Sequence, residues 1–240
     1  MPELLLGLDV GSTSVRTQVF DLEGRSLGTA GRRLRTRHPA PGHAEQDPEE
    51  VWEAARATIA EALSDAGRAA SDLGAIGLAT QRASVVVWER RTGRPVAPML
   101  LWSDLRGIER ADELREAGFL APPLAAVCKL EAALDQVRDG RARASAGELC
   151  WGTIDSYVMH HLTGGAAHVT DLSNAWPTCY LDLADVRRWN ERVIEHQGLP
   201  IGLFPTLCDS LGVLGHTAPD VLGAAVPIGA SLADQQSGML

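Results

Sequence analysis

The stretch from residue 4 to residue 21 constrains the fold of this chain most. Two runs of strand-forming residues, 4–10 and 14–21, flank a short turn that contains Gly11, Ser12 and Thr13. This pattern is typical of a β-hairpin. Gly11 allows backbone angles that a side chain would forbid, and it lets an anion approach the turn amides closely. The sequence therefore predicts a hairpin whose turn presents amide and hydroxyl donors.

Polar residues around this turn indicate a phosphate site. The turn amides and the hydroxyls of Ser12 and Thr13 can donate to phosphate oxygens. Asp9 ends the first strand, where its carboxylate would suit Mg²⁺ held mainly through water. Arg16 returns on the second strand with a guanidinium fork that fits phosphate. An ordinary hairpin whose polar side chains bond to their own backbone explains the same residues, so both interpretations stay open at this point.

Composition limits the class of protein. A length of 240 residues suits one large domain or two small ones, and 45% hydrophobic content allows a full core. The formal net charge of −9 disfavours a nucleic-acid surface, and the densest basic group, at residues 32–37, is interpreted as a solvated strand or loop. The four cysteines lack C-x-x-C spacing, no apolar run would span a membrane, and nothing resembles a signal peptide. We therefore expect a cytoplasmic protein with reduced thiols and no partner among membranes or nucleic acids.

The order of predicted elements indicates an α/β domain. The hairpin and a third strand at 26–37 precede a helix that Asp47 caps, with Pro48 at its first position, and that ends near Gly67. Further strands are predicted at 73–80, 84–89, 99–102 and 226–231, and further helices at 108–117, 129–138, 151–162 and 185–196. An antiparallel set of strands followed by alternating strands and helices predicts one domain with a mixed sheet and helices packed on it.

Three groups of polar residues follow predicted strands. Gln81 and Arg82 leave the strand at 73–80 and could hold the hydroxyls of a polyol, while Trp102 offers an indole for the apolar face of a sugar. Asp234 follows the last strand and could act as a general base toward a substrate hydroxyl in phosphoryl transfer. A surface turn, a core tryptophan and a plain helix N-cap are the alternatives for these groups.

Taken together, these segments resemble the N-terminal domain of the FGGY family of carbohydrate kinases, most closely its glycerol kinase-like members. The matching segments run in the same order through nearly the whole chain: residues 7–14, 45–48, 77–82, 101–106, 152–155, 162–165, 169–171, 174–175 and 233–236. The resemblance implies an actin-like, ribonuclease H-like fold. It also implies ATP-dependent phosphorylation of a sugar or polyol hydroxyl, with Mg²⁺, in a cleft between two domains.

The same resemblance implies roles for individual residues. Asp9 would help to hold Mg²⁺, and the turn of Gly11, Ser12 and Thr13 would meet the terminal phosphates with Arg16 nearby. The sugar pocket would be lined by Gln81, Arg82 and Trp102. Asp234 would be the catalytic base, and Gln235 would contact a substrate hydroxyl.

The chain departs from the family pattern at three points. Ala83 stands where glycerol kinases usually carry a Glu, and Leu124 stands where they carry a Tyr. A site that lacks these polar partners should lose strict specificity for glycerol. The sequence also stops at Leu240, so we expect residues 1–240 to be the substrate-binding half of a kinase whose C-terminal, ATP-binding domain is absent from this chain. The chain alone would then be inactive or very weak.

Two other functions remain open. A non-catalytic sugar-binding or sensor module of the same fold is compatible with Ala83, Leu124 and the absent domain. An Hsp70-like or actin-like ATPase is disfavoured because Gln81, Arg82 and Trp102 have no obvious task in one. The acceptor is not determined by the sequence, and a homodimer is among the assemblies that it allows.

Overall fold

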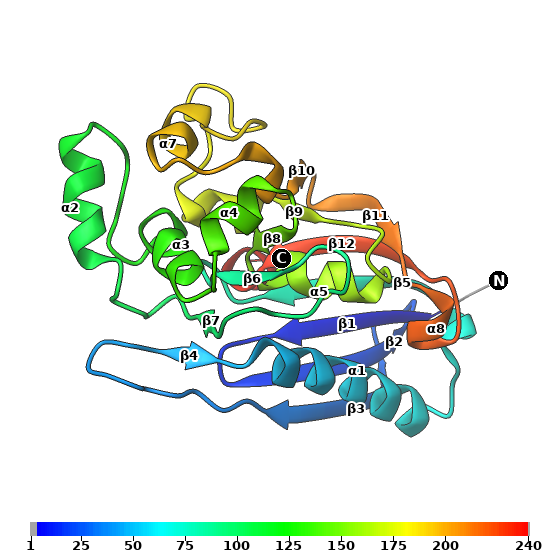
Figure 1. Ribbon diagram of the computed structural model, residues 1–240. Helices are drawn as coiled ribbons and strands as arrows, with labels where there is room; N and C mark the ends of the chain where they lie inside the picture. Colours follow the sequence, from blue (N-terminus) through cyan, green and yellow to red (C-terminus); the bar gives the residue numbers. More distant parts are fainter. Residues whose placement is uncertain (1–3, 240) are drawn as a thin grey trace.

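The computed structural model describes residues 4–239. Its centre is a six-stranded sheet in the order β11-β12-β5-β1-β2-β3 (Figure 1). Strands β1, β5 and β12 run parallel to one another, whereas β2, β3 and β11 pair antiparallel with their neighbours. The prediction of a mixed sheet is confirmed. The bounds of the six strands are Leu4–Val10 (β1), Ser14–Asp21 (β2), Ser26–Arg33 (β3), Leu73–Thr80 (β5), Leu211–His216 (β11) and Pro227–Ala233 (β12).

The predicted hairpin is formed by β1 and β2. Asp9 pairs with Arg16 across it, and the amide of Gly11 donates to the carbonyl of Ser14 at 3.0 Å to close the turn. The even-numbered side chains of β1 are buried, whereas Leu5 on the opposite face is 42% exposed. This alternation follows from the two-residue period of a strand and shows which face of the sheet packs against helices.

Helix α1, Pro48–Asp65, covers that face at β2 and β3 (Figure 1). As predicted, Asp47 is its N-cap, with a carboxylate that accepts from the amide of Glu49 at 3.0 Å. The helix carries Thr58 against β2, where the hydroxyl of Thr17 donates to its hydroxyl at 2.8 Å. Both threonines are fully buried, so this pair satisfies two polar groups inside the core.

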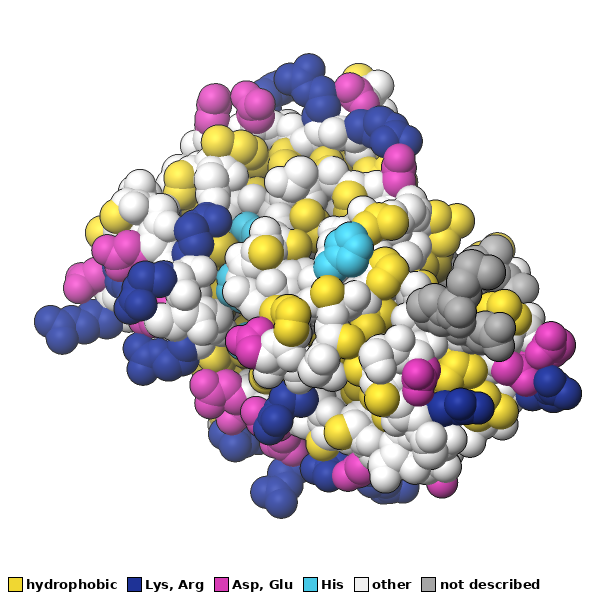
Figure 2. Space-filling view, turned by 90° about the vertical axis from the view of Figure 1, so that its right-hand side faces the viewer, with side chains coloured by type: hydrophobic (Ala, Val, Ile, Leu, Met, Phe, Trp, Pro, Cys, Tyr) yellow, Lys and Arg dark blue, Asp and Glu magenta, His cyan; other side chains and the backbone are white. Residues whose placement is uncertain are grey.

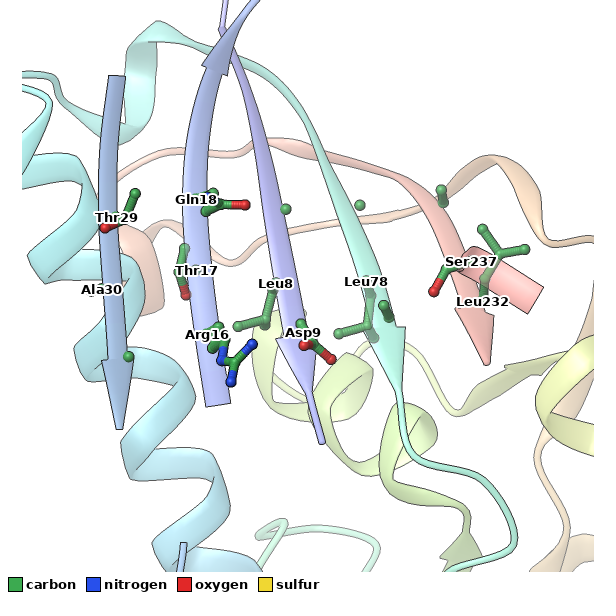
Figure 3. A pocket seen from close by; sticks show the side chains of 15 residues that line it. Leu8, Asp9, Arg16, Thr17, Gln18, Thr29, Ala30, Leu78, Leu232 and Ser237 are labelled. Atoms are coloured by element: carbon green, nitrogen blue, oxygen red, sulfur yellow. The ribbon is translucent and has the colours of Figure 1, made fainter. Parts of the chain in front are cut away.

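Helix α5, Ile154–Leu162, packs against β5 and shares one hydrophobic cluster with α1 and the buried side of the sheet. The other side carries a shallow groove of about 670 Å³ across β3, β2, β1, β5 and β12 (Figure 3). Small residues form most of its floor, including Gly7, Gly77, Ala79 and Ala230. The sheet therefore has one face covered by α1 and α5, and another face that carries a shallow groove lined mostly by small side chains.

A second hydrophobic cluster lies beside the sheet. Its centre contains Trp151, Tyr180 and Phe204, whose ring centroids are 5.0–5.5 Å apart. Four helices gather near it (Figure 1): α2, α3, α4 and α7. The elements of this region are β6 (Val86–Glu89), β8 (Leu149–Gly152), α2 (Ile108–Glu116), α3 (Ala126–Asp135), α4 (Gly140–Ser145) and α7 (Glu191–His196).

Short elements complete the described chain. Strands β4 and β7 pair antiparallel, and β9 and β10 pair parallel. Their bounds and those of the short helices are Glu45–Gln46 (β4), Met99–Leu100 (β7), Val169–Asp171 (β9), Thr206–Cys208 (β10), Leu172–Ala175 (α6), Pro219–Leu222 (α8) and Asp234–Ser237 (α9), with 3₁₀ turns at Ala70–Asp72, Trp176–Thr178 and Ile201–Leu203.

Most element boundaries differ from the predictions by a few residues. The third strand ends at residue 33 rather than 37, the helix predicted at 129–138 spans 126–135, and the last strand spans 227–233. The segment that begins at Trp151 does not open a helix, because residues 149–152 pair with β6 and the helix begins only at Ile154. Leu240, the last residue of the sequence, lies outside the described residues.

The helix predicted at 185–196 is wrong in its first half, since α7 spans only residues 191–196. The carboxylates of Asp182 and Asp185 accept hydrogen bonds from the backbone amides two residues later, at 2.9 and 3.1 Å. Trp189 then pairs with Leu181 in an isolated bridge. Aspartates that bond to their own backbone compete with helix formation, and here the resulting turns replace the first part of the helix.

The surface charge is mixed. On the face shown in Figure 2, basic and acidic side chains are interspersed. Arg32, from the densest basic group of the sequence, forms an ion pair with Glu61 of α1. Within residues 4–239 no helix is long and apolar enough to cross a membrane. All four cysteines are free thiols.

The close contact between β3 and α1 generates a first prediction. A Cβ atom on Gly28 would lie 2.4 Å from the carbonyl oxygen of Ala62 and 2.6 Å from the amide of Ala66. Gly28→Ala should therefore push the helix from the sheet and lower the free energy of unfolding by about 1–3 kcal/mol. Urea denaturation would measure the loss.

Gly77→Ala is the matched control, because Gly77 lies in β5 of the same sheet and a Cβ there would meet no atom within 4 Å. It should cost much less stability than Gly28→Ala. Equal losses for the two variants would contradict the packing described here.

Candidate active site

Three parallel strands bring the predicted site residues to one edge of the sheet. Asp9 of β1 is aligned with Ala79 of β5, which is aligned with Leu232 of β12. The chain leaves β5 toward Arg82 and leaves β12 at Asp234, so the polar residues that follow these strands lie at the same edge as Asp9. In α/β sheets this carboxyl-terminal edge is where ligands bind.

Asp9 and Arg16 face each other at this edge. They are paired across the β1–β2 hairpin, and Figure 3 shows both side chains on the groove face of the sheet. Burial raises the pKa of Asp9, the guanidinium of Arg16 opposes the rise, and the negative charge of Asp234 adds to it. Asp234 therefore lies close enough for its charge to act on Asp9.

Two buried amide side chains hold the hairpin turn. Gln46 donates through Nε2 to the carbonyl of Ser12 at 2.6 Å, and Gln81 donates through Nε2 to the carbonyl of Gly11 at 3.4 Å. The amide of Leu34 donates to the carbonyl of Thr13 at 3.0 Å. These bonds use the carbonyl groups of the turn and fix its backbone. Gln46 belongs to a matching segment of the sequence, but only the structure shows its contact with the turn.

One cavity of about 770 Å³ opens beside this turn. Six of the predicted site residues line it, together with a second group of residues that is mostly apolar. The first group, called the polar wall, consists of Ser12, Gln81, Arg82, Trp102, Asp234 and Gln235. The second group, called the apolar wall, includes Phe119, Leu120, Leu124, Trp176, Leu181 and Leu183, and the polar residues Asn190 and Arg192 also line the cavity. The structure therefore gathers the predicted acceptor residues in one place. Asp9 and Arg16 line the neighbouring groove on the sheet face.

The residues of the polar wall differ in burial. Trp102 is 47% exposed, and Arg82 donates to the side-chain oxygen of Gln235 across the cavity wall. Gln81 is only 2% exposed, and its Oε1 atom has no hydrogen-bond partner within the described part of the chain. A buried carbonyl oxygen without a partner is unusual in a folded protein.

Asp234 is exposed at the first position of α9. The N-cap position of this helix belongs to Ala233, so Asp234 does not cap the helix. Among the described residues, its carboxylate accepts one hydrogen bond, from the amide of Gln235 at 2.8 Å. Most of its lone pairs therefore face the cavity or solvent, as a proton acceptor requires.

Asp171 connects the ends of β5 and β12. Its carboxylate accepts from the side chains of Ser173, Asn174 and Ser210 at 2.6–2.7 Å. Ser173 in turn accepts from the amide of Ala233 at 2.8 Å, and Asn174 accepts from the hydroxyl of Thr80 at 3.1 Å. These bonds join the residues that directly precede Asp234 and Gln81, a connection that only the fold reveals.

A buried ion-pair cluster supports the segment that carries Trp102. Asp104 is fully buried, pairs with Arg106 at 2.8 Å and accepts from the amide of Ala44 at 2.7 Å. Arg106 also pairs with Glu45 at 2.8 Å. Asp104 and Arg106 thus form a local ion pair that also fixes the backbone beside Trp102.

The two residues at which the chain departs from the family pattern lie at the cavity. Ala83 and Leu124 line it, and each presents an apolar side chain. Ala83 has a φ angle of 56°, in the left-handed region that costs a residue with a side chain about 1–2 kcal/mol.

The sheet order and the polar residues at its carboxyl-terminal edge define an α/β domain of the actin-like class.

Comparison with known proteins agrees with this class. A sequence profile of the FGGY family of carbohydrate kinases, N-terminal domain, matches residues 4–240. The chain belongs to this family. It is 42% identical over 243 residues to a glycerol kinase of Aromatoleum aromaticum and 38% identical over 247 residues to one of Citrifermentans bemidjiense. These alignments cover 97% and 99% of the chain, and 49% and 50% of the relatives.

Solved structures show the same fold. Plasmodium falciparum glycerol kinase with ADP superimposes with a TM-score of 0.88 at 21% identity, over 98% of this chain and 49% of that one. Xylulose kinase from Rhodospirillum rubrum gives a TM-score of 0.84 at 25% identity, over 98% and 50%. The chain thus spans about half the length of the relatives that it matches.

The buried Asp155 generates a prediction about pH. It is fully buried and accepts from the hydroxyl of Thr170 at 2.8 Å. Burial raises its pKa to about 7, and repulsion from Asp171 adds to the rise. Between about pH 4 and pH 7 the folded state therefore binds more protons than the unfolded state at this group, so the contribution of Asp155 to the free energy of unfolding falls as pH rises.

Asp155→Asn removes this titration. The free energy of unfolding of the variant, relative to the wild type, should therefore increase as pH rises from about 4 to about 7, as urea denaturation at several pH values would show. Asp220→Asn, at an exposed position of α8, is the control. Wild type and Asp155→Asn curves that run parallel over this range would contradict the prediction.

Proposed function

We propose that this chain is the acceptor-binding half of a kinase that transfers phosphate from ATP to a hydroxyl of a sugar or polyol. One observation carries the proposal: Arg82, Trp102 and Asp234 line a single cavity that opens beside the hairpin turn at Ser12. The relatives named above are glycerol and xylulose kinases. Residues 1–240 would form the N-terminal domain, and the second half of such a kinase would complete the ATP site.

The hairpin would hold the phosphates of ATP. The amides and hydroxyls at Gly11, Ser12 and Thr13 are suited to phosphate oxygens, because Gln46 and Gln81 fix the turn through its carbonyl groups. Arg16 adds a positive charge near the start of β2, close to the hairpin turn. ADP is bound by the P. falciparum glycerol kinase of the same fold, which supports a nucleotide as the donor.

The carboxylates of Asp9 and Asp234 suit Mg²⁺, which takes many of its ligands from water and substrate, better than they suit a metal ion whose ligands all come from protein. No group of three or more His, Cys, Asp or Glu side chains able to hold a metal occurs within residues 4–239. Asp9 and Asp234 nevertheless share one edge of the sheet, and Mg²⁺ commonly binds through one or two carboxylates together with water and substrate phosphates. Asp9 would hold the ion, which would neutralise charge on the phosphates.

The acceptor would lie between Trp102 and Asp234. The exposed indole can pack on the apolar face of a sugar, and Arg82, Gln81 and Gln235 can bond to its hydroxyls. The carboxylate of Asp234 would accept the proton of the reacting hydroxyl as its oxygen attacks the phosphoryl group. Free thiols and the use of ATP are compatible with a cytoplasmic location for this reaction.

The apolar wall indicates an acceptor other than glycerol. Ala83 and Leu124 replace two polar contacts, and the neighbouring wall contains Phe119, Leu120 and Trp176. A larger polyol or sugar with an apolar face would fill this cavity better than a three-carbon triol.

Activity of the whole kinase that contains this chain tests the proposal. The assay would use a panel of glycerol, erythritol, xylitol, D-xylulose and gluconate. Asp234→Asn should reduce kcat by about 10²–10⁴-fold, because a general base contributes this much, while the melting temperature stays unchanged because the side chain is exposed. Asp220→Asn, on the exposed surface of α8, should keep full activity.

The outcome that contradicts the proposal is equally specific. A folded kinase that phosphorylates no acceptor of the panel, together with saturable sugar binding that Asp234→Asn leaves unchanged, would indicate a non-catalytic binding module. Calorimetry on the 240-residue chain would supply the binding measurement.

Acceptor specificity gives a further prediction. Ala83→Glu combined with Leu124→Tyr would place a carboxylate and a phenol at the apolar positions of the cavity. The ratio of kcat/KM for glycerol to that for the best larger acceptor should rise about tenfold or more, since sites built to bond hydroxyls discriminate strongly. Leu120→Tyr, on the same wall, is the matched control. An unchanged ratio in the double variant would show that these two positions do not set specificity.

A further inference from the structure

Lys129 lies inside the protein, behind the acceptor cavity. It belongs to α3 and is fully buried. Its Nζ atom lies 2.9 Å from the carbonyl oxygen of Ala83, 2.7 Å from that of Leu101 and 3.4 Å from that of Trp102. An ammonium group has three N–H donors, so three carbonyl oxygens satisfy it.

The carbonyl groups belong to two segments that carry cavity residues. Ala83 directly follows Arg82, and Leu101 directly precedes Trp102. Backbone hydrogen bonds between Val85 and Leu100 also join the two segments, but deeper in the core. Lys129 joins them at their ends nearest the cavity, where the backbone of Ala83 has its left-handed conformation. A strained residue of this kind persists only where its surroundings hold it.

The surroundings of Lys129 act on its charge in opposite directions. Burial lowers the pKa of Lys129 to about 7, and the negative charge of Asp104 opposes this change, whereas Arg106 adds to it. The three carbonyl oxygens favour the ammonium form. A buried amino group is costly, and no part of its side chain reaches the cavity surface. Its contacts therefore indicate a role in holding the backbone.

We propose that Lys129 is a positioning residue for the acceptor site, which sets the separation of Arg82 and Trp102 by binding the backbone of both segments through one ammonium group. The proposal rests on the proposed function insofar as the cavity takes an acceptor. The residue acts through Arg82 and Trp102 and does not touch the acceptor. Its loss should weaken acceptor binding without a matching effect on ATP.

Lys129→Met tests the proposal, because Met has a similar length but no donor. Leu130→Ala is the matched control: Leu130 is the next residue of α3 and is equally buried, and its truncation destabilises the same core cluster without removing a bond to either segment. The first measurement is amide hydrogen exchange on the 240-residue chain without ligand. Lys129→Met should speed exchange at least tenfold at the hydrogen-bonded amides of Val85, Leu101 and Asp104 and leave β1 and β5 unchanged.

The second measurement is kinetics in the whole kinase, with the best acceptor of the panel above. Lys129→Met should raise the KM for the acceptor at least tenfold and change the KM for ATP less than twofold, whereas Leu130→Ala should change neither. Unchanged exchange at the two segments, or an acceptor KM that stays at the wild-type value, would overturn the proposal. Should the wild type phosphorylate no acceptor, the proposed function fails, and the exchange measurement still decides whether Lys129 holds the two segments.

Discussion

The parallel pairing of β1, β5 and β12 is the constraint on which the rest of this structure depends. Residues that are far apart in the sequence, Asp9, Arg82 and Asp234, reach one edge because the strands before them run in the same direction and in register. Parallel strands need crossover connections, and the long segments between these three strands supply them. A slip of one residue in any of the strands would turn its polar residue to the other face.

Strand pairing alone does not hold the site, because the chain is free to turn once it leaves the sheet. Buried polar groups perform this second task. Gln46 binds the hairpin turn, Asp171 binds the residues before Gln81 and Asp234 through its neighbours, and Lys129 binds the segments beside Arg82 and Trp102. A buried polar group that lacks its partners is destabilising, so such networks favour a single arrangement of the loops that they join. Their cost in desolvation is offset by the bonds they make.

The cavity combines two kinds of wall, and this contrast bears on specificity. Polar residues that follow strands form one side, whereas the other side is built by segments of the second hydrophobic cluster, with Leu124 and Trp176 exposed to the cavity. Because the polar edge comes from the sheet and the apolar wall largely from a separate cluster, the wall can change without moving the edge. Variation in Leu124 is therefore compatible with an unchanged position for Asp234.

The sequence alone determined the elements with strong local signals. The hairpin, the α1 helix with its Asp47 cap and the apolar strand at 73–80 have clear sequence patterns of apolar and turn residues. The family motifs supplied the predicted site residues. The tertiary structure alone decided the contacts that link distant segments, such as Asp171 with Ser210 and Lys129 with Ala83. The turns that replace the predicted helix at 185–190 have a local cause, the bond from the amide of Arg187 to Asp185, and a longer-range one, the bridge between Leu181 and Trp189. The physical reason is that a hydrogen bond between remote residues leaves no periodic trace in the sequence, whereas the alternation of buried and exposed side chains does.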